Sequence, residues 1–150
     1  MNAQHSTDSN KIVSSLMNFY EQFNHERLES LDKLYTQDVE FRDPVHTMYG
    51  ILSLKAYMKK LATDLSFYRI RYTDKLAAEN QAYLTWEMDY AHPKVNGGEV
   101  ITVRGMSHIK YTTRIFYHED SYDMGALLYE KLPVIGSITT FLKQRLGKQE

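Results

Sequence analysis

Two acidic positions in this sequence have the surroundings that proton-transfer chemistry needs. Asp43 stands directly before Pro44, at the end of a short stretch that alternates apolar and polar residues. His118 and Asp120 lie two residues apart in a later alternating stretch, so their side chains share one face of a strand. A carboxylate among apolar walls can serve as a general base near neutral pH, and a carboxylate beside a histidine can fix its tautomer.

Each of these positions also has a purely structural interpretation. Asp-Pro often starts a turn, and His118 with Asp120 would also suit a salt bridge at the mouth of a pocket. Tyr20 lies on an apolar helical stripe, where it is either a functional hydroxyl or a core residue with its hydroxyl at the rim. His46 follows Asp43 in a loop and could close over the same pocket.

The elements that must position these residues change in character near residue 66. Before it, apolar residues recur at helical spacing, with Ser9 or Asn10 as N-caps, and predict helices over 10–23, 28–35 and 54–65. Alternating stretches predict strands over 39–44, 67–72, 83–90, 100–111 and 114–122, with a turn at Asn96-Gly97. Helices followed by an antiparallel meander indicate an α+β domain with helices packed on one face of a curved sheet.

Composition excludes several classes of protein. The 150 residues carry 18 basic and 19 acidic side chains, a balance that gives no reason to expect nucleic-acid binding. There is no cysteine, no glycine-rich phosphate loop and no close histidine spacing, so we expect neither a cofactor nor a metal. The polar N-terminus and the lack of a long apolar stretch predict a cytoplasmic protein. Contact with a membrane could come only from the C-terminal helix.

The stretch that leads to Asp43 also carries a family resemblance. It reads L-M-N-F-Y-E-Q-F from Leu16 and L-D-K-L-Y-T-Q-D-V-E-F-R-D-P from Leu31. In this it resembles the nuclear transport factor 2-like superfamily, which includes ketosteroid isomerases and SnoaL-like polyketide cyclases. The resemblance covers roughly residues 10–124. It implies a cone-like curved antiparallel sheet wrapped on three N-terminal helices, enclosing an apolar cavity, and a homodimer through the convex face of the sheet.

The resemblance also implies roles for particular residues. The isomerase pattern places its tyrosine on Tyr20 and its proton-carrying aspartate on Asp43, but its second carboxylic acid falls on Ser107 or nearby His108, which donate more weakly. The cyclase pattern instead implies acid–base chemistry on the last strand, where Asp120 and His118 stand.

We therefore expect three parts: a frayed segment over 1–9, a SnoaL-like domain over 10–124, and a helical tail over 125–150 packed on the domain or on a dimer mate. The domain is expected to bind a small apolar molecule and, as an enzyme, to be a cofactor-independent isomerase, cyclase or dehydratase. The alternatives are a non-catalytic carrier of a lipid or terpenoid-like ligand and a protein-interaction domain. The expected catalytic residues are Asp43, Tyr20, His118 and Asp120, and the expected ligand-binding residues are Leu16, His46, Tyr57, Leu84, Trp86, Met88, Val103, Ser107 and Tyr122.

Overall fold

The structure is a computed structural model and describes residues 2–123, 144, 146 and 147. Three α-helices and a six-stranded sheet make up the domain, and the predicted α+β class is confirmed. The predicted tail over 125–150 lies almost entirely outside the described residues.

The helices precede most of the sheet, as expected, but the first of them is longer than predicted. Helix α1 spans Asn2–Glu21 and so includes the segment that we expected to be frayed. Ser9, predicted as a cap, lies inside the helix, and its hydroxyl donates to the backbone carbonyl of Glu79 at 2.9 Å. This long-range hydrogen bond ties the early turns of α1 to the loop between two strands.

The predicted second helix is split, and its last residue belongs to a strand. A 3₁₀ helix, η1, spans His25–Ser30, and a single helical turn, α2, spans Leu31–Leu34. Asn24 caps η1, because its side chain accepts a hydrogen bond from the backbone amide of Arg27. Tyr35 then begins strand β1, Tyr35–Arg42. Helix α3 spans Ile51–Asp64.

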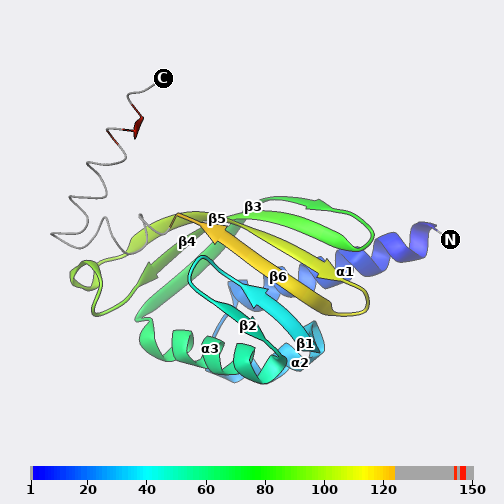
Figure 1. Cartoon of the computed structure of the whole chain (residues 1–150), viewed down its shortest axis with the longest axis horizontal. Helices are drawn as coiled ribbons and strands as arrows, with labels where there is room; N and C mark the ends of the chain where they lie inside the picture. The colour runs from blue at the N-terminus through cyan, green and yellow to red at the C-terminus, as the bar shows by residue number, and fades with distance from the viewer. Residues whose placement is uncertain (1, 124–143, 145, 148–150) are drawn as a thin grey trace.

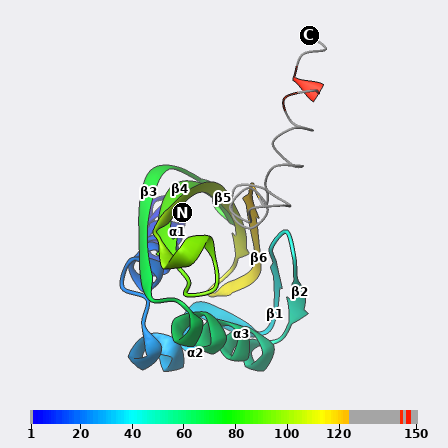
Figure 2. The ribbon, with the colours of Figure 1, turned by 90° about the vertical axis from the view of Figure 1, so that its left-hand side faces the viewer.

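The sheet has the strand order β2-β1-β6-β5-β4-β3. Its remaining strands are β2 (Thr47–Tyr49), which was not predicted, β3 (Phe67–Ala77), β4 (Gln81–Ala91), β5 (Ile101–Tyr111) and β6 (Ile115–Tyr122). Figure 1 shows α2 and α3 at the lower edge of the domain, and Figure 2 shows the sheet curving around the interior, with α1 next to β3 and with α2 and α3 below the sheet.

One pairing differs from the antiparallel sheet that we predicted. β1 pairs with β6 in parallel, with Phe41 opposite His118, so the sheet is mixed. The long crossover through α3, β3, β4 and β5 makes this possible, because a parallel pair needs a long connection rather than a hairpin. The pairing brings the segment just before Asp43 next to the strand that carries Asp120.

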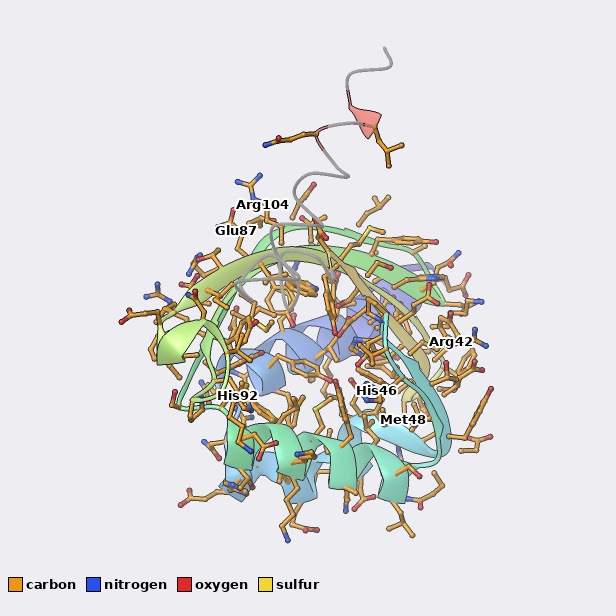
Figure 3. All side chains as sticks on the ribbon, turned by 60° about the vertical axis from the view of Figure 1, so that its left-hand side comes forward. Arg42, His46, Met48, Glu87, His92 and Arg104 are labelled. Carbon is orange, nitrogen blue, oxygen red and sulfur yellow. The ribbon has the colours of Figure 1, made fainter. Side chains whose placement is uncertain are left out.

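The two faces of the sheet differ in chemistry, as the alternation predicted. Figure 3 shows Arg104 and Glu87 on the outer side, away from the helices. There, Asp89 accepts hydrogen bonds from Arg69 at 2.8 Å, Arg71 at 2.6 Å and Thr102 at 2.7 Å. The hydrogen bond from Arg71, followed by those from Thr102 and Arg69, holds the pKa of Asp89 well below its usual range.

On the inner face, one glycine leaves room for the side chain of the only tryptophan in the sequence. Gly105 on β5 lies opposite Trp86 on β4, and a Cβ at residue 105 would lie 2.2 Å from Cη2 of the indole. A side chain at this position would therefore push the indole off its place on the sheet.

We predict that Gly105→Ala destabilises the protein. Removing a strand glycine gains about 0.5–1 kcal/mol of conformational free energy, whereas overpacking typically costs about 1–3 kcal/mol, so the net change is a loss. Urea unfolding followed by Trp86 fluorescence measures it. A midpoint equal to or above that of the unsubstituted protein would contradict this packing.

Candidate functional site

A pocket opens between the inner face of the sheet, the end of α1 and helix α3. It holds about 160 Å³ of free space. Nine of its lining residues are aromatic, five are aliphatic or methionine, and four are polar. The lining residues are Tyr20, Phe23, Phe41, Asp43, Tyr57, Met58, Leu61, Leu65, Tyr68, Ile70, Tyr72, Trp86, Met88, Tyr90, Ser107, His118, Asp120 and Tyr122.

The structure places nine of the thirteen predicted site residues on this lining, although their functional roles stay predictions. They include all four residues predicted to be catalytic, and they come from α1, α3, three strands and the turn that follows β1. The nine are Tyr20, Asp43, Tyr57, Trp86, Met88, Ser107, His118, Asp120 and Tyr122.

The other four predicted residues lie elsewhere. Leu16 and Leu84 are fully buried in the main hydrophobic core, and Val103 packs in a smaller cluster with Tyr90 and Ile101. His46 lies beyond the end of β1 with half of its side chain exposed. Alternation along a strand gives the inward face, but it does not tell which inward residues touch open space and which touch other side chains.

Asp120 is held from the side of β5 and β4 by two donors in series. The Trp86 indole N–H donates to Ser107 Oγ at 2.9 Å, and the Ser107 hydroxyl donates to Asp120 Oδ1 at 2.5 Å. The serine that replaces the second carboxylic acid of the isomerase pattern therefore has a defined task here, which is to fix the orientation of Asp120.

From the other side, Asp120 is held through a buried histidine. His118 Nε2 lies 2.7 Å from Asp120 Oδ1, and His118 Nδ1 lies 2.7 Å from the Tyr35 hydroxyl. The Tyr35 hydroxyl is in turn 2.8 Å from that of Tyr20. His118 is 1% exposed and both of its nitrogens are engaged, so its imidazole orients Asp120.

When His118 is neutral, these hydrogen bonds have one consistent set of directions. Oδ1 of Asp120 accepts, so Nε2 of His118 donates, and in the neutral imidazole Nδ1 must then accept. Tyr35 therefore donates to Nδ1, and its oxygen accepts from Tyr20. The protons of Tyr20, Tyr35, His118, Ser107 and Trp86 all point along the network toward one oxygen atom.

Asp43 is held in a different way, by the turn that it starts. Its Oδ1 accepts from the backbone amides of Val45 at 2.8 Å and His46 at 2.7 Å, which is the structural role that Asp-Pro suggested. Its Oδ2 accepts from the Tyr57 hydroxyl at 2.7 Å. Both oxygens of Asp43 are therefore occupied, although the residue lines the pocket.

The contrast identifies the better placed base. Among the described residues, Oδ2 of Asp120 has no hydrogen-bond partner, and it is not sealed from solvent. A general base needs an oxygen within reach of the proton that it takes. Asp120 offers such an oxygen without breaking an existing hydrogen bond, whereas Asp43 would have to give up Tyr57.

The tyrosines around the pocket remain protonated. Burial raises the pKa of Tyr57, and its hydrogen bond to Asp43 raises it further. Burial is also the main cause of the raised pKa of Tyr20, Tyr68 and Tyr122, and the negative charge of Asp120 adds to it in each case. These phenols can donate hydrogen bonds at any physiological pH, and they experience a negative potential from Asp120.

Sequence reasoning missed several residues of the site. Tyr68 and Tyr72 alternate with Arg69 and Arg71, so their inward direction was readable, but nothing showed that a pocket lay there. Tyr35 was assigned to the apolar stripe of a helix, and its contact with His118 depends on the parallel pairing of β1 with β6.

Nothing within residues 2–123 gathers three or more side chains of the types that bind metals. Over the same part of the chain, no helix is long and apolar enough to cross a membrane.

Comparison with solved structures gives the class of fold. A nuclear transport factor 2-like protein of unknown function from Burkholderia pseudomallei has a TM-score of 0.67 at 16% identity, covering 77% of this chain and 93% of its own. A candidate SnoaL-like polyketide cyclase from Jannaschia has a TM-score of 0.69 at 11% identity, covering 81% and 89%. A protein with a ketosteroid isomerase-like fold from Catenulispora acidiphila, in complex with trimethylamine, has a TM-score of 0.67 at 12% identity, covering 80% and 90%.

The fold is therefore that of nuclear transport factor 2-like proteins. The family model of the SnoaL-like domain matches residues 16–114, and the chain belongs to this family. No curated protein matches the sequence.

We predict that Tyr35→Phe destabilises the protein by about 1–3 kcal/mol, because it leaves the buried His118 Nδ1 and the Tyr20 hydroxyl without their partner. Tyr72→Phe is the matched control, since Tyr72 lines the same pocket and its hydroxyl has no hydrogen-bond partner among the described residues. Chemical denaturation of both variants measures the difference, and equal losses would contradict the network.

Proposed function

We propose that this protein is a cofactor-independent enzyme that moves a proton on a small, largely apolar carbonyl compound, with Asp120 as the proton carrier. The observation that carries the proposal is the arrangement of Asp120: one oxygen is fixed by Ser107 and His118, and the other has no partner among the described residues. Isomerisation, cyclisation and dehydration all begin with such a proton transfer.

The reaction changes two atoms of the substrate, the carbon that loses a proton and the carbonyl oxygen that gains negative charge. Asp120 Oδ2 takes a proton from the carbon next to the carbonyl. The electron pair of the broken C–H bond forms the C=C bond of the enolate, and the π pair of the carbonyl moves onto its oxygen. The same proton, now on Asp120, returns to a different atom in an isomerisation. Donors to Oδ1 keep the carboxylate oriented through both steps, which is the positioning that proton transfer requires.

A donor for the developing oxyanion is also needed. Tyr20 was the predicted donor, but its proton is directed to Tyr35. Tyr122 lines the pocket two residues after Asp120, and its hydroxyl has no hydrogen-bond partner among the described residues. We assign the oxyanion donor to Tyr122, whose raised pKa keeps it protonated.

The size of the pocket supports a small substrate. Its 160 Å³ is close to that of an engineered cavity of about 150 Å³ that holds benzene, and below the range of about 300–1,000 Å³ typical of drug-sized ligands. The trimethylamine bound by the Catenulispora protein supports the same scale of ligand for this fold.

We predict that Asp120→Asn lowers turnover by about 10²–10⁴-fold, the range that general acid–base catalysis contributes. Deuterium uptake from D₂O into a panel of monocyclic ketones and β,γ-unsaturated ketones, followed by NMR, measures the proton transfer without knowledge of the natural product. Asn keeps an acceptor oxygen for Ser107 and His118, so the fold is expected to survive.

Asp38→Asn is the matched control, because Asp38 is an exposed carboxylate on β1, away from the pocket. It should exchange at the rate of the unsubstituted protein. Asp43→Asn should have a smaller effect than Asp120→Asn. If Asp43→Asn abolishes exchange while Asp120→Asn retains it, the assignment of the base is wrong.

We also propose that the protein forms a homodimer through the outer face of the sheet. Tyr83 on β4 and Met106 on β5 are large apolar side chains on this face, each 39% exposed. A dimer interface would cover them.

Light scattering coupled to size-exclusion chromatography tests the dimer. Met106→Glu should shift the protein to monomer, because it places a charge at the centre of the apolar contact. Leu52→Glu on α3, where the side chain is 79% exposed, should remain dimeric. A monomeric unsubstituted protein would contradict the proposal.

A further inference from the structure

Among the described residues, the two carboxylates of the pocket have histidines beside them but no lysine or arginine. Asp43 and Asp120 both line it, and the side chain of Asp43 is only 2% exposed. Among the described lining residues there is no lysine and no arginine. The partners of the two carboxylates are hydroxyls, backbone amides and imidazoles.

The outer face of the same sheet shows what the pocket lacks. There, Asp89 is paired with Arg69 and Arg71, and Glu87 is paired with Arg71 and Arg104. Buried charges are costly unless they are paired. The two carboxylates of the pocket face an apolar space without a lysine or arginine. A positively charged ligand can therefore stabilise them.

The walls of the pocket suit the same kind of ligand. Aromatic faces attract cations through their quadrupoles, with tryptophan and tyrosine the strongest partners. Trp86 and Tyr122 lie against each other, with ring centroids 6.2 Å apart and planes tilted by 55°. Tyr57 and Phe41 form a second tilted pair at 5.9 Å. Each pair has a carboxylate nearby, since Trp86 connects to Asp120 through Ser107, and Tyr57 donates to Asp43.

We propose that the pocket selects a small organic cation: an apolar body that carries one tertiary or quaternary ammonium group. This inference rests on the proposed function, because it names the substrate class of the same pocket. Methyl or methylene groups of such a ligand pack on the aromatic walls, while its positive charge offsets the two carboxylates.

The proposed chemistry gives the charge a further consequence. Removing a proton next to a carbonyl moves one negative charge from Asp120, which becomes a neutral carboxylic acid, to the substrate, where the enolate forms in a pocket that still holds the Asp43 carboxylate. A substrate with an ammonium group becomes a neutral zwitterion in that step instead of an anion. The cation therefore lowers the electrostatic cost of the transition state as well as that of binding.

A pair of isosteres tests the inference. Choline and 3,3-dimethylbutan-1-ol differ by one atom, N⁺ or carbon, and so have nearly equal shape. Isothermal titration calorimetry of the full-length protein with each probe measures the contribution of charge alone. We expect choline to bind at least tenfold more tightly than the alcohol, and this preference to fall below threefold in Asp120→Asn.

Two further variants complete the comparison. Asp43→Asn should also reduce the preference for choline, and it provides a second measurement of this preference if Asp120→Asn does not fold. Asp38→Asn should leave the preference unchanged. Equal binding of the two probes, no saturable binding of choline, or an undiminished preference in both pocket variants would overturn the cationic ligand class.

The outcome is separable from that of the proposed reaction. Equal binding of the isosteres, together with loss of ketone exchange in Asp120→Asn, overturns the cationic ligand class alone. A strong preference for choline, together with full exchange in Asp120→Asn, overturns the role of Asp120 as base and leaves the ligand class standing.

Discussion

The position of His118 is the constraint on which the site depends. Its imidazole, on β6, is buried, stacks on Tyr35 of β1, lies at a tilted angle to Phe41, and has both nitrogens engaged. A buried polar ring is tolerated only when its hydrogen bonds are made, so the parallel pairing of β1 with β6 and the approach of α1 must both be correct for this residue to be accommodated. The same hydrogen bonds orient Asp120, and in this way the folding of three separate elements is coupled to the geometry of one carboxylate.

The sequence predicted the elements better than it predicted their contacts. Alternation along β4, β5 and β6 correctly gave the inward direction of Trp86, Ser107 and Asp120, because side-chain direction in a strand depends only on local geometry. It could not distinguish Leu84, which is sealed in the core, from Trp86, which borders open space. Leu84 lies opposite Ser107 and Trp86 lies opposite Gly105, and such cross-strand partners depend on register.

Long-range pairing explains the remaining differences. Tyr35 matched a helical stripe because it follows Leu31 and Leu34, but the helix ends after one turn and the chain extends to pair with β6. Asp43 shows the opposite case. Its local signal, Asp before Pro, correctly indicated a turn, and the structure places that turn beside the pocket, so the residue that starts the turn also contributes to the pocket lining.

The hydrogen bonds from Tyr20 through Tyr35 and His118 to Asp120 depend on one another for their directions. Each tyrosine has a single hydroxyl proton, so Tyr35 cannot donate to His118 and to Tyr20 at once. A hydrogen bond from Tyr35 to His118 Nδ1 therefore makes Tyr20 the donor between the two tyrosines, whereas a hydrogen bond from Tyr35 to Tyr20 requires Nδ1 to be the donor. The position of the ring protons of a histidine on the last strand therefore determines whether a tyrosine hydroxyl on the first helix donates or accepts.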